Sequence, residues 1–169
     1  MNWERVRLVA LDVDGVLTDG RLYVSANGVE LVTFDVKDGL AIARAVRAGL
    51  HVAFITGRES AAVARRAAEL GVQHCWQAVA DKRAALTKLA AELCVAREEI
   101  VFLGDDVNDL PAFAAAGLRV AVADAVEEVR ARADYVTSAP GGRGAAREVI
   151  ELIMKAQGCW TNEPAETRQ

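Results

Sequence analysis

The chain has 169 residues, a formal net charge of −4 at pH 7 and a hydrophobic fraction of 53%. This length favours one compact domain, and the hydrophobic fraction is too high for a disordered chain. The negative charge disfavours nucleic acid and anionic membrane surfaces as partners, because both attract basic proteins.

Short apolar runs alternate with helical stretches along the chain. Runs that are too short for helices and rich in Val, Ile or Leu predict buried strands at residues 6–11, 52–55, 100–103 and 118–122. Amphipathic patterns and glycine stops predict helices at residues 39–48, 60–70, 81–93, 108–116 and 126–133. This alternation favours an α/β fold, with a mostly parallel central sheet and helices on both of its faces.

One segment departs from the alternation. Residues 22–24 and 29–32 are strand-like and are joined through Asn27-Gly28, a dipeptide typical of tight hairpin turns, so we expect a projecting hairpin over about residues 21–34. We expect a single domain over residues 1–158. Residues 159–169 are predicted to form a flexible tail, because residues 161–169 are polar and contain a proline.

Targeting and cysteine patterns point to a cytoplasmic protein. No apolar run approaches the roughly 20 residues of a membrane helix, so no membrane interaction is expected. The first residues lack the order of a signal peptide. Cys75, Cys94 and Cys159 are an odd set without Cys-x-x-Cys spacing, which argues against both a disulfide framework and a zinc site.

Polar residues follow the first three buried runs. Asp12 and Asp14 follow the first, Thr56 follows the second, and Asp105 and Asp109 follow the third. Ligands of open parallel sheets bind beyond the carboxyl ends of the strands, so these side chains are expected to line one crevice. Their carboxylates would repel one another without a cation, and a few oxygen ligands with room for water and phosphate favour Mg²⁺.

The same residues indicate phosphate chemistry. The Thr56 hydroxyl, the Lys82 ammonium and a metal ion would together clamp a phosphoryl group. No Ser-His-Asp or Cys-His pairing is evident, so the expected nucleophile is a carboxylate.

The ordered motifs resemble those of the haloacid dehalogenase superfamily of phosphatases. They are Asp-Val-Asp-Gly-Val-Leu-Thr-Asp-Gly at residues 12–20, then Thr56, Lys82 and Gly-Asp-Asp-Val-Asn-Asp at residues 104–109, and the likeness covers nearly the whole chain. The resemblance implies a Rossmann-like fold. The intervals between the motifs are too short for a separate cap domain.

Further stretches resemble one subfamily, which dephosphorylates 3-deoxy-D-manno-octulosonate 8-phosphate in lipopolysaccharide sugar synthesis. These are the hairpin, Phe-Asp-Val-Lys-Asp-Gly at residues 34–39, and Gly-Gly-Arg-Gly-Ala-Ala-Arg-Glu at residues 141–148. The expected partner is thus a small phosphorylated sugar acid. The resemblance also implies a homotetramer in which hairpins meet and neighbouring subunits shape each pocket.

The resemblance assigns roles residue by residue. Asp12 would attack phosphorus, and Asp14 would act as general acid and then general base. Mg²⁺ would be held by Asp12, the Asp14 backbone carbonyl and Asp105, and Thr56 and Lys82 would bind the phosphoryl oxygens. Support for the metal or site is expected from Asp106, Asn108 and Asp109, and substrate contacts from Lys37, Gly57, Arg58, Arg66, Arg143 and Arg147.

Two departures and three alternatives accompany this interpretation. Ala41 and Ala78 stand where many relatives have glycine, and each is expected to add a Cβ near the substrate. A nonulosonate 9-phosphate phosphatase is the alternative substrate class, although its pattern has Glu where this chain has Arg58. A receiver domain would place its phospho-accepting Asp where this chain has Thr56, and a non-catalytic oligomerisation module would not need the complete motif set.

Overall fold

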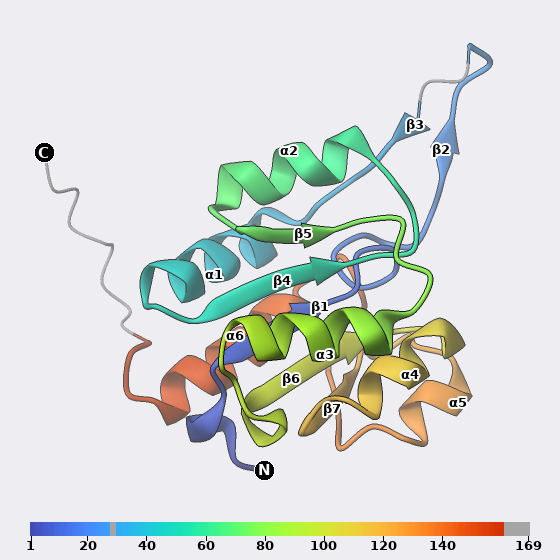
Figure 1. Cartoon of the computed structure of the whole chain (residues 1–169). Helices are drawn as coiled ribbons and strands as arrows, with labels where there is room; N and C mark the ends of the chain where they lie inside the picture. Colours follow the sequence, from blue (N-terminus) through green and yellow to red (C-terminus); the bar gives the residue numbers. More distant parts are fainter. Residues whose placement is uncertain (28–29, 161–169) are drawn as a thin grey trace, which may run out of the picture.

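A six-stranded sheet lies at the centre of the computed structural model, which describes residues 1–27 and 30–160 (Figure 1). Within these residues the strand order is β5-β4-β1-β6-β7-β8, and every neighbouring pair is parallel. The strands are β1 (Leu8–Leu11), β4 (His51–Ile55), β5 (His74–Trp76), β6 (Ile100–Gly104), β7 (Leu118–Ala121) and β8 (Tyr135–Val136). The predicted α/β fold with a mostly parallel sheet is confirmed.

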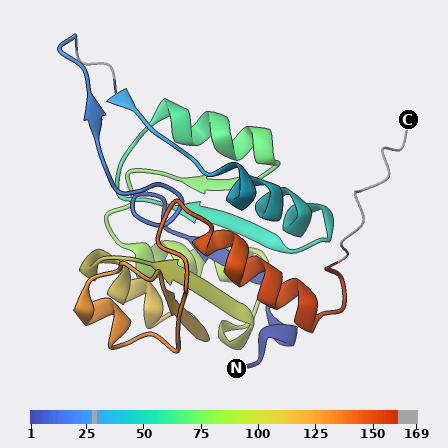
Figure 2. The ribbon, with the colours of Figure 1, turned by 180° about the vertical axis from the view of Figure 1, so that it is seen from behind.

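Helices cover both faces of this sheet. Figures 1 and 2 show α1 and α6 side by side on one face, with α3 and α4 on the other. Right-handed crossovers give this division, because the chain winds first toward β5 and then back across β1 toward β8. The helices are α1 (Val36–Arg47), α2 (Ala61–Leu70), α3 (Lys82–Glu92), α4 (Leu110–Phe113), α5 (Glu127–Arg130) and α6 (Ala145–Ala156), with 3₁₀ turns η1 (Trp3–Arg5), η2 (Arg97–Glu99) and η3 (Val107–Asp109).

The core consists of the central strands and the apolar faces of the helices. All residues of β1 and β6 are buried, which explains why these segments read as continuous apolar runs rather than alternating ones. Phe54 and Phe102 are the largest fully buried side chains, and Phe102 packs edge-on against Phe113 of α4. Burial of such side chains contributes about 1.5–3 kcal/mol each.

Two short strands were not predicted from the sequence. β5 is only partly buried and contains the polar His74, and β8 has two residues, so neither forms the apolar run that indicates a central strand. Both pair on one side only, at the edges of the sheet. The helices predicted at 108–116 and 126–133 are also shorter in the structure, where η3 precedes α4 and α5 has a single turn.

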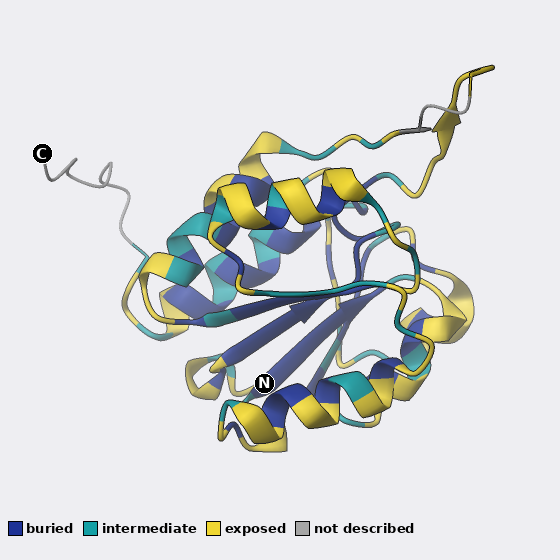
Figure 3. Ribbon diagram, turned by 45° about the horizontal axis from the view of Figure 1, so that its top comes forward, coloured by how far each residue is buried: buried dark blue, intermediate teal, exposed yellow. Residues whose placement is uncertain are grey.

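The predicted hairpin projects from the body of the molecule (Figures 1 and 3). Its strands β2 (Tyr23–Val24) and β3 (Glu30–Leu31) are antiparallel, with Tyr23 opposite Leu31. The part of the predicted turn at residues 28–29 and residues 161–169 of the predicted tail lie outside the described residues. Of the tail, Trp160 is described and lies within 5.1 Å of the Arg44 guanidinium. No helix among the described residues has the length and apolar character to cross a bilayer.

Candidate active site

The predicted site residues meet where the strand order reverses. β1 lies between β4, to which the chain first crosses, and β6, to which it later returns. Such a switch point leaves a crevice beyond the carboxyl ends of the strands. Asp12 follows β1, Thr56 follows β4 and Asp105 follows β6, so the topology brings them together as the sequence predicted.

A buried ion-pair network forms the floor of the crevice. Lys82 Nζ lies 2.8 Å from Asp12 Oδ1 and 2.7 Å from Asp109 Oδ1, and all three side chains are at most 5% exposed. Lys82 is the first residue of α3, where the helix dipole disfavours a cation, so the two carboxylates are what stabilise its charge there. Asp12 Oδ1 also accepts a 2.7 Å bond from the Val13 N–H. These contacts fix the orientation of the Asp12 carboxylate.

The electrostatics of the cluster favour protonation in the absence of a cation. Burial and the nearby Asp109 raise the pKa of Asp12 to about 7, although Lys82 and the bond from the Val13 N–H act to lower it. Burial and repulsion from Asp12 and Asp109 raise the pKa of Asp105 to about 8. Burial lowers the pKa of Lys82, but its two carboxylate partners outweigh this effect and leave that pKa above its ordinary value.

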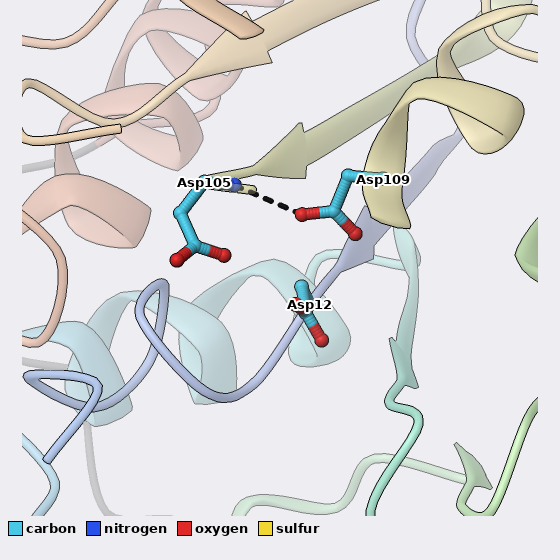
Figure 4. Close-up of side chains that lie close together, drawn as sticks. All are labelled: Asp12, Asp105 and Asp109. Atoms are coloured by element: carbon cyan, nitrogen blue, oxygen red, sulfur yellow. Dashed lines mark hydrogen bonds between the residues drawn. The ribbon is translucent and has the colours of Figure 1, made fainter. Parts of the chain in front are cut away.

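Three carboxylates of this cluster fit a hard divalent cation. Figure 4 shows Asp12, Asp105 and Asp109 facing a common point, and one oxygen from each lies within 4.8 Å of the others. Asp105 Oδ1 is buried without a hydrogen-bond partner, which costs free energy unless a cation binds there. Oxygen-only donors of this kind suit Mg²⁺. The donor set therefore fits the predicted metal.

Asp109 and Asp106 have different surroundings. Asp109 Oδ2 accepts bonds from the backbone N–H groups of Asp105, at 2.9 Å, and Asp106, at 3.4 Å, while its Oδ1 is paired with Lys82. Asp106 caps η3 through a 2.7 Å bond from the Val107 N–H. Both oxygens of Asp109 are thus engaged by protein groups, which makes it the residue that organises the loop around Asp105.

The crevice is polar and has a volume of about 220 Å³. Asp14 stands there, 3.4 Å from both Thr56 Oγ1 and Arg58 Nη1. The Thr56 hydroxyl in turn accepts a 3.3 Å bond from the Arg58 N–H. The lining residues are Asp12, Asp14, Gly20, Thr56, Gly57, Arg58, Asp105, Asp106 and Asn108.

Four predicted substrate contacts lie outside this crevice in the single chain. Arg66 packs over the Phe34 ring and pairs with Glu69 on α2. Arg147 lies on α6 beside Glu151 and the Trp160 ring. Lys37 is exposed in the first turn of α1, and Arg143 lies in the turn before α6.

Two buried polar residues that hold backbone segments together, Thr18 and Asp38, were not predicted as functional residues from the sequence. The buried Thr18 hydroxyl accepts 3.2 Å bonds from the Gly15 and Gly20 N–H groups, which closes the loop after Asp14. The position of the Thr18 hydroxyl between two glycines of the first motif could have indicated this loop-closing contact. Asp38 is 2% exposed and caps α6, and no pattern of spacing indicates such a contact.

The two departures from the glycine pattern have different surroundings. Ala41 is fully buried in the core on α1, so the expectation that its Cβ lies near the substrate is wrong. Ala78 is exposed, and its N–H donates to the Arg58 carbonyl, which places it beside the crevice.

Comparison with known proteins gives consistent matches. The family model of haloacid dehalogenase-like hydrolases matches residues 75–148. The chain is 47% identical over 155 residues to the 3-deoxy-D-manno-octulosonate 8-phosphate phosphatase of Escherichia coli, covering 92% of this chain and 82% of that protein. The corresponding enzyme of Haemophilus influenzae is 43% identical over 92% of this chain and 86% of its own length.

Solved structures agree with the sequence matches. The 3-deoxy-D-manno-octulosonate 8-phosphate phosphatase of Yersinia pestis superposes with a TM-score of 0.91 at 43% identity, covering 93% of this chain and 85% of that one. The enzyme of Moraxella catarrhalis, solved with a magnesium ion, a phosphate ion and a KDO molecule, gives a TM-score of 0.90 at 43% identity, over 92% and 90% of the two chains.

Proposed function

Because this chain belongs to the family of 3-deoxy-D-manno-octulosonate 8-phosphate phosphatases among the haloacid dehalogenase-like hydrolases, we propose that it hydrolyses this phosphate ester to the free sugar acid and inorganic phosphate. The chain is a phosphatase, and its cofactor is Mg²⁺. The observation that carries the proposal is the cluster of buried Asp12 and Lys82 with the half-buried Asp105, of which Asp12 and Asp105 line an open polar crevice.

Asp12 is the nucleophile in this proposal. Its Oδ1 is held by Lys82 and by the Val13 N–H, so Oδ2 is the oxygen that attacks phosphorus. The bond from Asp12 to phosphorus forms as the bond to the sugar oxygen breaks, which leaves the phosphoryl group on the carboxylate. Lys82 and Thr56 bind the phosphoryl oxygens.

Asp14 transfers the protons. It donates one to the departing sugar oxygen, and its carboxylate then takes one from the water that attacks the phosphorylated Asp12. This second attack breaks the bond between Asp12 and phosphorus and releases phosphate. Asp14 stands at the mouth of the crevice, where both the leaving group and water have access.

Asp12, Asp105 and the Asp14 backbone carbonyl are the groups that would hold Mg²⁺, with Asp106, Asn108 and Asp109 in support. When bound, the ion supplies positive charge that offsets the repulsion between the Asp12 carboxylate and an anionic phosphate ester. The unpartnered Asp105 Oδ1 supports its place in this set. Asp109 supports the set indirectly, through the Asp105 N–H and Lys82.

Substrate selection involves Gly57 and Arg58 at the mouth of the crevice. Lys37, Arg66, Arg143 and Arg147 are proposed to contact the sugar acid in an assembly, because none of them lines the crevice of one chain.

We also place the reaction in the cytoplasm. The free thiols of Cys75, Cys94 and Cys159 suit a reducing compartment.

The assembly that we propose is a homotetramer joined through its hairpins. Leu22, Val24 and Leu31 are 55%, 65% and 62% exposed, a concentration of apolar surface on a short two-stranded unit that is marginal alone. Pairing with copies of itself in closed symmetry would cover every hairpin equally.

A phosphate-release assay on a panel of esters tests the function. The panel contains 3-deoxy-D-manno-octulosonate 8-phosphate, a nonulosonate 9-phosphate and glucose 6-phosphate, each with Mg²⁺ and with chelator. We expect the highest kcat/KM for the first ester and no turnover with chelator. Asp12→Asn is nearly isosteric and should lower kcat by about 10³-fold or more while the protein still unfolds cooperatively on heating.

Other results of this assay would contradict specific parts of the proposed function. A higher kcat/KM for the nonulosonate ester would favour the alternative substrate. Full rate in chelator would exclude the metal assignment, and wild-type turnover by Asp12→Asn would exclude the nucleophile. No turnover of any ester would favour the non-catalytic module.

A further inference from the structure

Asp38 is a buried carboxylate that the proposed reaction does not use. It lies in the first turn of α1, is 2% exposed, and accepts two backbone bonds from the start of α6. Its Oδ2 receives the Gly144 N–H at 3.0 Å and its Oδ1 receives the Arg147 N–H at 2.7 Å. A carboxylate from another helix therefore caps α6, whose own N-cap residue is a glycine without a side chain.

The turn that precedes α6 packs against the loop that carries Asp14. The Gly142 N–H donates a 2.9 Å bond to the Val16 carbonyl. A Cβ built on Gly141 would stand 1.7 Å from the Gly15 carbonyl oxygen, and one on Gly142 would stand 2.4 Å from the Thr18 carbonyl carbon. Only glycine permits this approach, so residues 141–144 form a backbone support for residues 15–18.

Gly15 lies between this support and the proposed metal site. A Cβ on Gly15 would fall 2.0 Å from Asp105 Oδ2, so the loop backbone fills the space beside that carboxylate. Asp38 thus contacts Gly144 at one end of the turn 141–144, Gly141 at its other end packs against Gly15, and Gly15 packs against Asp105. Asp124 also holds the turn, through a 2.8 Å bond to the Gly141 N–H.

We propose that Asp38 is a positioning residue for the catalytic loop: by fixing the start of α6 it holds the turn 141–144 in place and so seats Gly15 against Asp105. The inference rests on the proposed function, which gives Asp14 and Asp105 their roles. Asp38 neither lines the crevice nor belongs to the carboxylate cluster. Its effect passes through backbone contacts, and a displacement of Gly15 would move both the Asp14 carbonyl and the wall beside Asp105.

The variants Asp38→Asn and Gly141→Ala test this series of contacts at two points. The amide keeps the shape of Asp38 but presents a donor to one of the two N–H groups. Gly141→Ala leaves the α6 cap intact and pushes the added Cβ against Gly15. For both variants we expect kcat to fall about tenfold and the Kd for Mg²⁺, measured by calorimetry, to rise severalfold, with KM changed less than twofold.

Hydrogen exchange provides a readout that does not depend on the reaction. Amides of residues 13–20 should exchange at least tenfold faster in both variants. The matched control is Asp134→Asn, which removes a carboxylate that accepts the Arg119 N–H at 2.9 Å in a different part of the fold. It should leave kcat, Mg²⁺ affinity and exchange in residues 13–20 unchanged.

Two outcomes would overturn the inference. One is wild-type exchange in residues 13–20 for Asp38→Asn, whatever Gly141→Ala shows, and the other is a loss of kcat in Asp38→Asn no larger than that of Asp134→Asn. If Asp38→Asn does not fold, Asp38→Glu, which keeps the charge but moves the carboxylate away from the Gly144 and Arg147 N–H groups, replaces it in the same measurements. If the wild type hydrolyses no ester of the panel, the proposed function fails, whereas the exchange and Mg²⁺ readouts still test whether Asp38 seats the loop.

Discussion

The backbone of Ala78 adopts a left-handed conformation with φ of 53°. A side chain with a Cβ pays about 1–2 kcal/mol for this conformation relative to the right-handed region. Hydrogen bonds from the Ala78 N–H to the Arg58 carbonyl and from the Val79 N–H to the Thr56 carbonyl hold the segment there. Because of this local strain, glycine would suit position 78 better than alanine, independently of any contact with substrate.

Ala78→Gly should therefore stabilise the protein, by about 0.5–1 kcal/mol. The relief of about 1–2 kcal/mol is reduced by the extra freedom that glycine gives the unfolded chain. Urea unfolding measures the change. Ala85→Gly inside α3 serves as the control and should destabilise by about 1 kcal/mol, because that residue is helical. Equal destabilisation by both changes would exclude strain at Ala78.

At the scale of elements, Glu148 joins α6 to the segment that leads into it. Its Oε1 accepts bonds from the Tyr135 hydroxyl at 2.7 Å and the Ser138 N–H at 2.9 Å, and its Oε2 accepts the Ala139 N–H at 3.0 Å. The Glu148 side chain, in the first turn of α6, thus holds β8 and the following loop against the helix through hydrogen bonds. The hydrogen bond to Glu148, with burial, raises the pKa of Tyr135 to about 12.

This raised pKa predicts a stability contribution that disappears at alkaline pH. The folded protein holds the Tyr135 proton more tightly than the unfolded chain, so the contribution is complete below pH 10 and is lost as the pH rises towards 12. Urea unfolding should find Tyr135→Phe less stable than wild type by about 1 kcal/mol at pH 8. The difference should shrink between pH 10 and 11, and a difference independent of pH would contradict the assignment.

At the scale of the whole molecule, the hairpin concentrates exposed apolar side chains among the residues that the structure describes. The body has one core cluster and leaves scattered apolar residues such as Val36 and Val107 exposed, whereas Leu22, Val24 and Leu31 lie together on the hairpin and are all more than half exposed. Figure 3 shows this exposed unit beyond the helical layers. Its placement near the helices that carry Lys37 and Arg66 is consistent with pockets completed by a second copy.

Val24→Asp combined with Leu31→Asp should dissociate the proposed homotetramer. Four copies of the hairpin would bring these charges together without solvent, at a cost that exceeds any gain from pairing. Sedimentation should show a monomer, and kcat/KM should fall at least tenfold. The control, Val24→Ile with Leu31→Ile, keeps an apolar surface and should remain assembled. A wild-type chain that is a fully active monomer at the assay concentration would exclude the proposal.

The sequence by itself determined the fold class and the central residues of the crevice, whereas it also predicted four substrate contacts that lie outside the crevice of one chain. Short apolar runs rich in Val, Ile or Leu favour strands buried on both faces, and the carboxyl ends of parallel strands lie at one edge of the sheet, so the residues that follow them are expected to meet. That is why Asp12, Thr56 and Asp105 could be placed together without coordinates. Lys82 was predicted to join these residues because it follows Thr56 in the order of the motifs and stands at the start of a predicted helix.

Only the tertiary structure decided the contacts between segments that no periodic pattern relates. The short edge strands β5 and β8 lack an apolar run, and Ala41 faces the core because of how α1 packs. Asp38 and Gly144 are 106 residues apart and meet because α1 and α6 cover the same face of the sheet. Spacing in a sequence reports periodicity within one element, whereas such caps depend on where two elements pack.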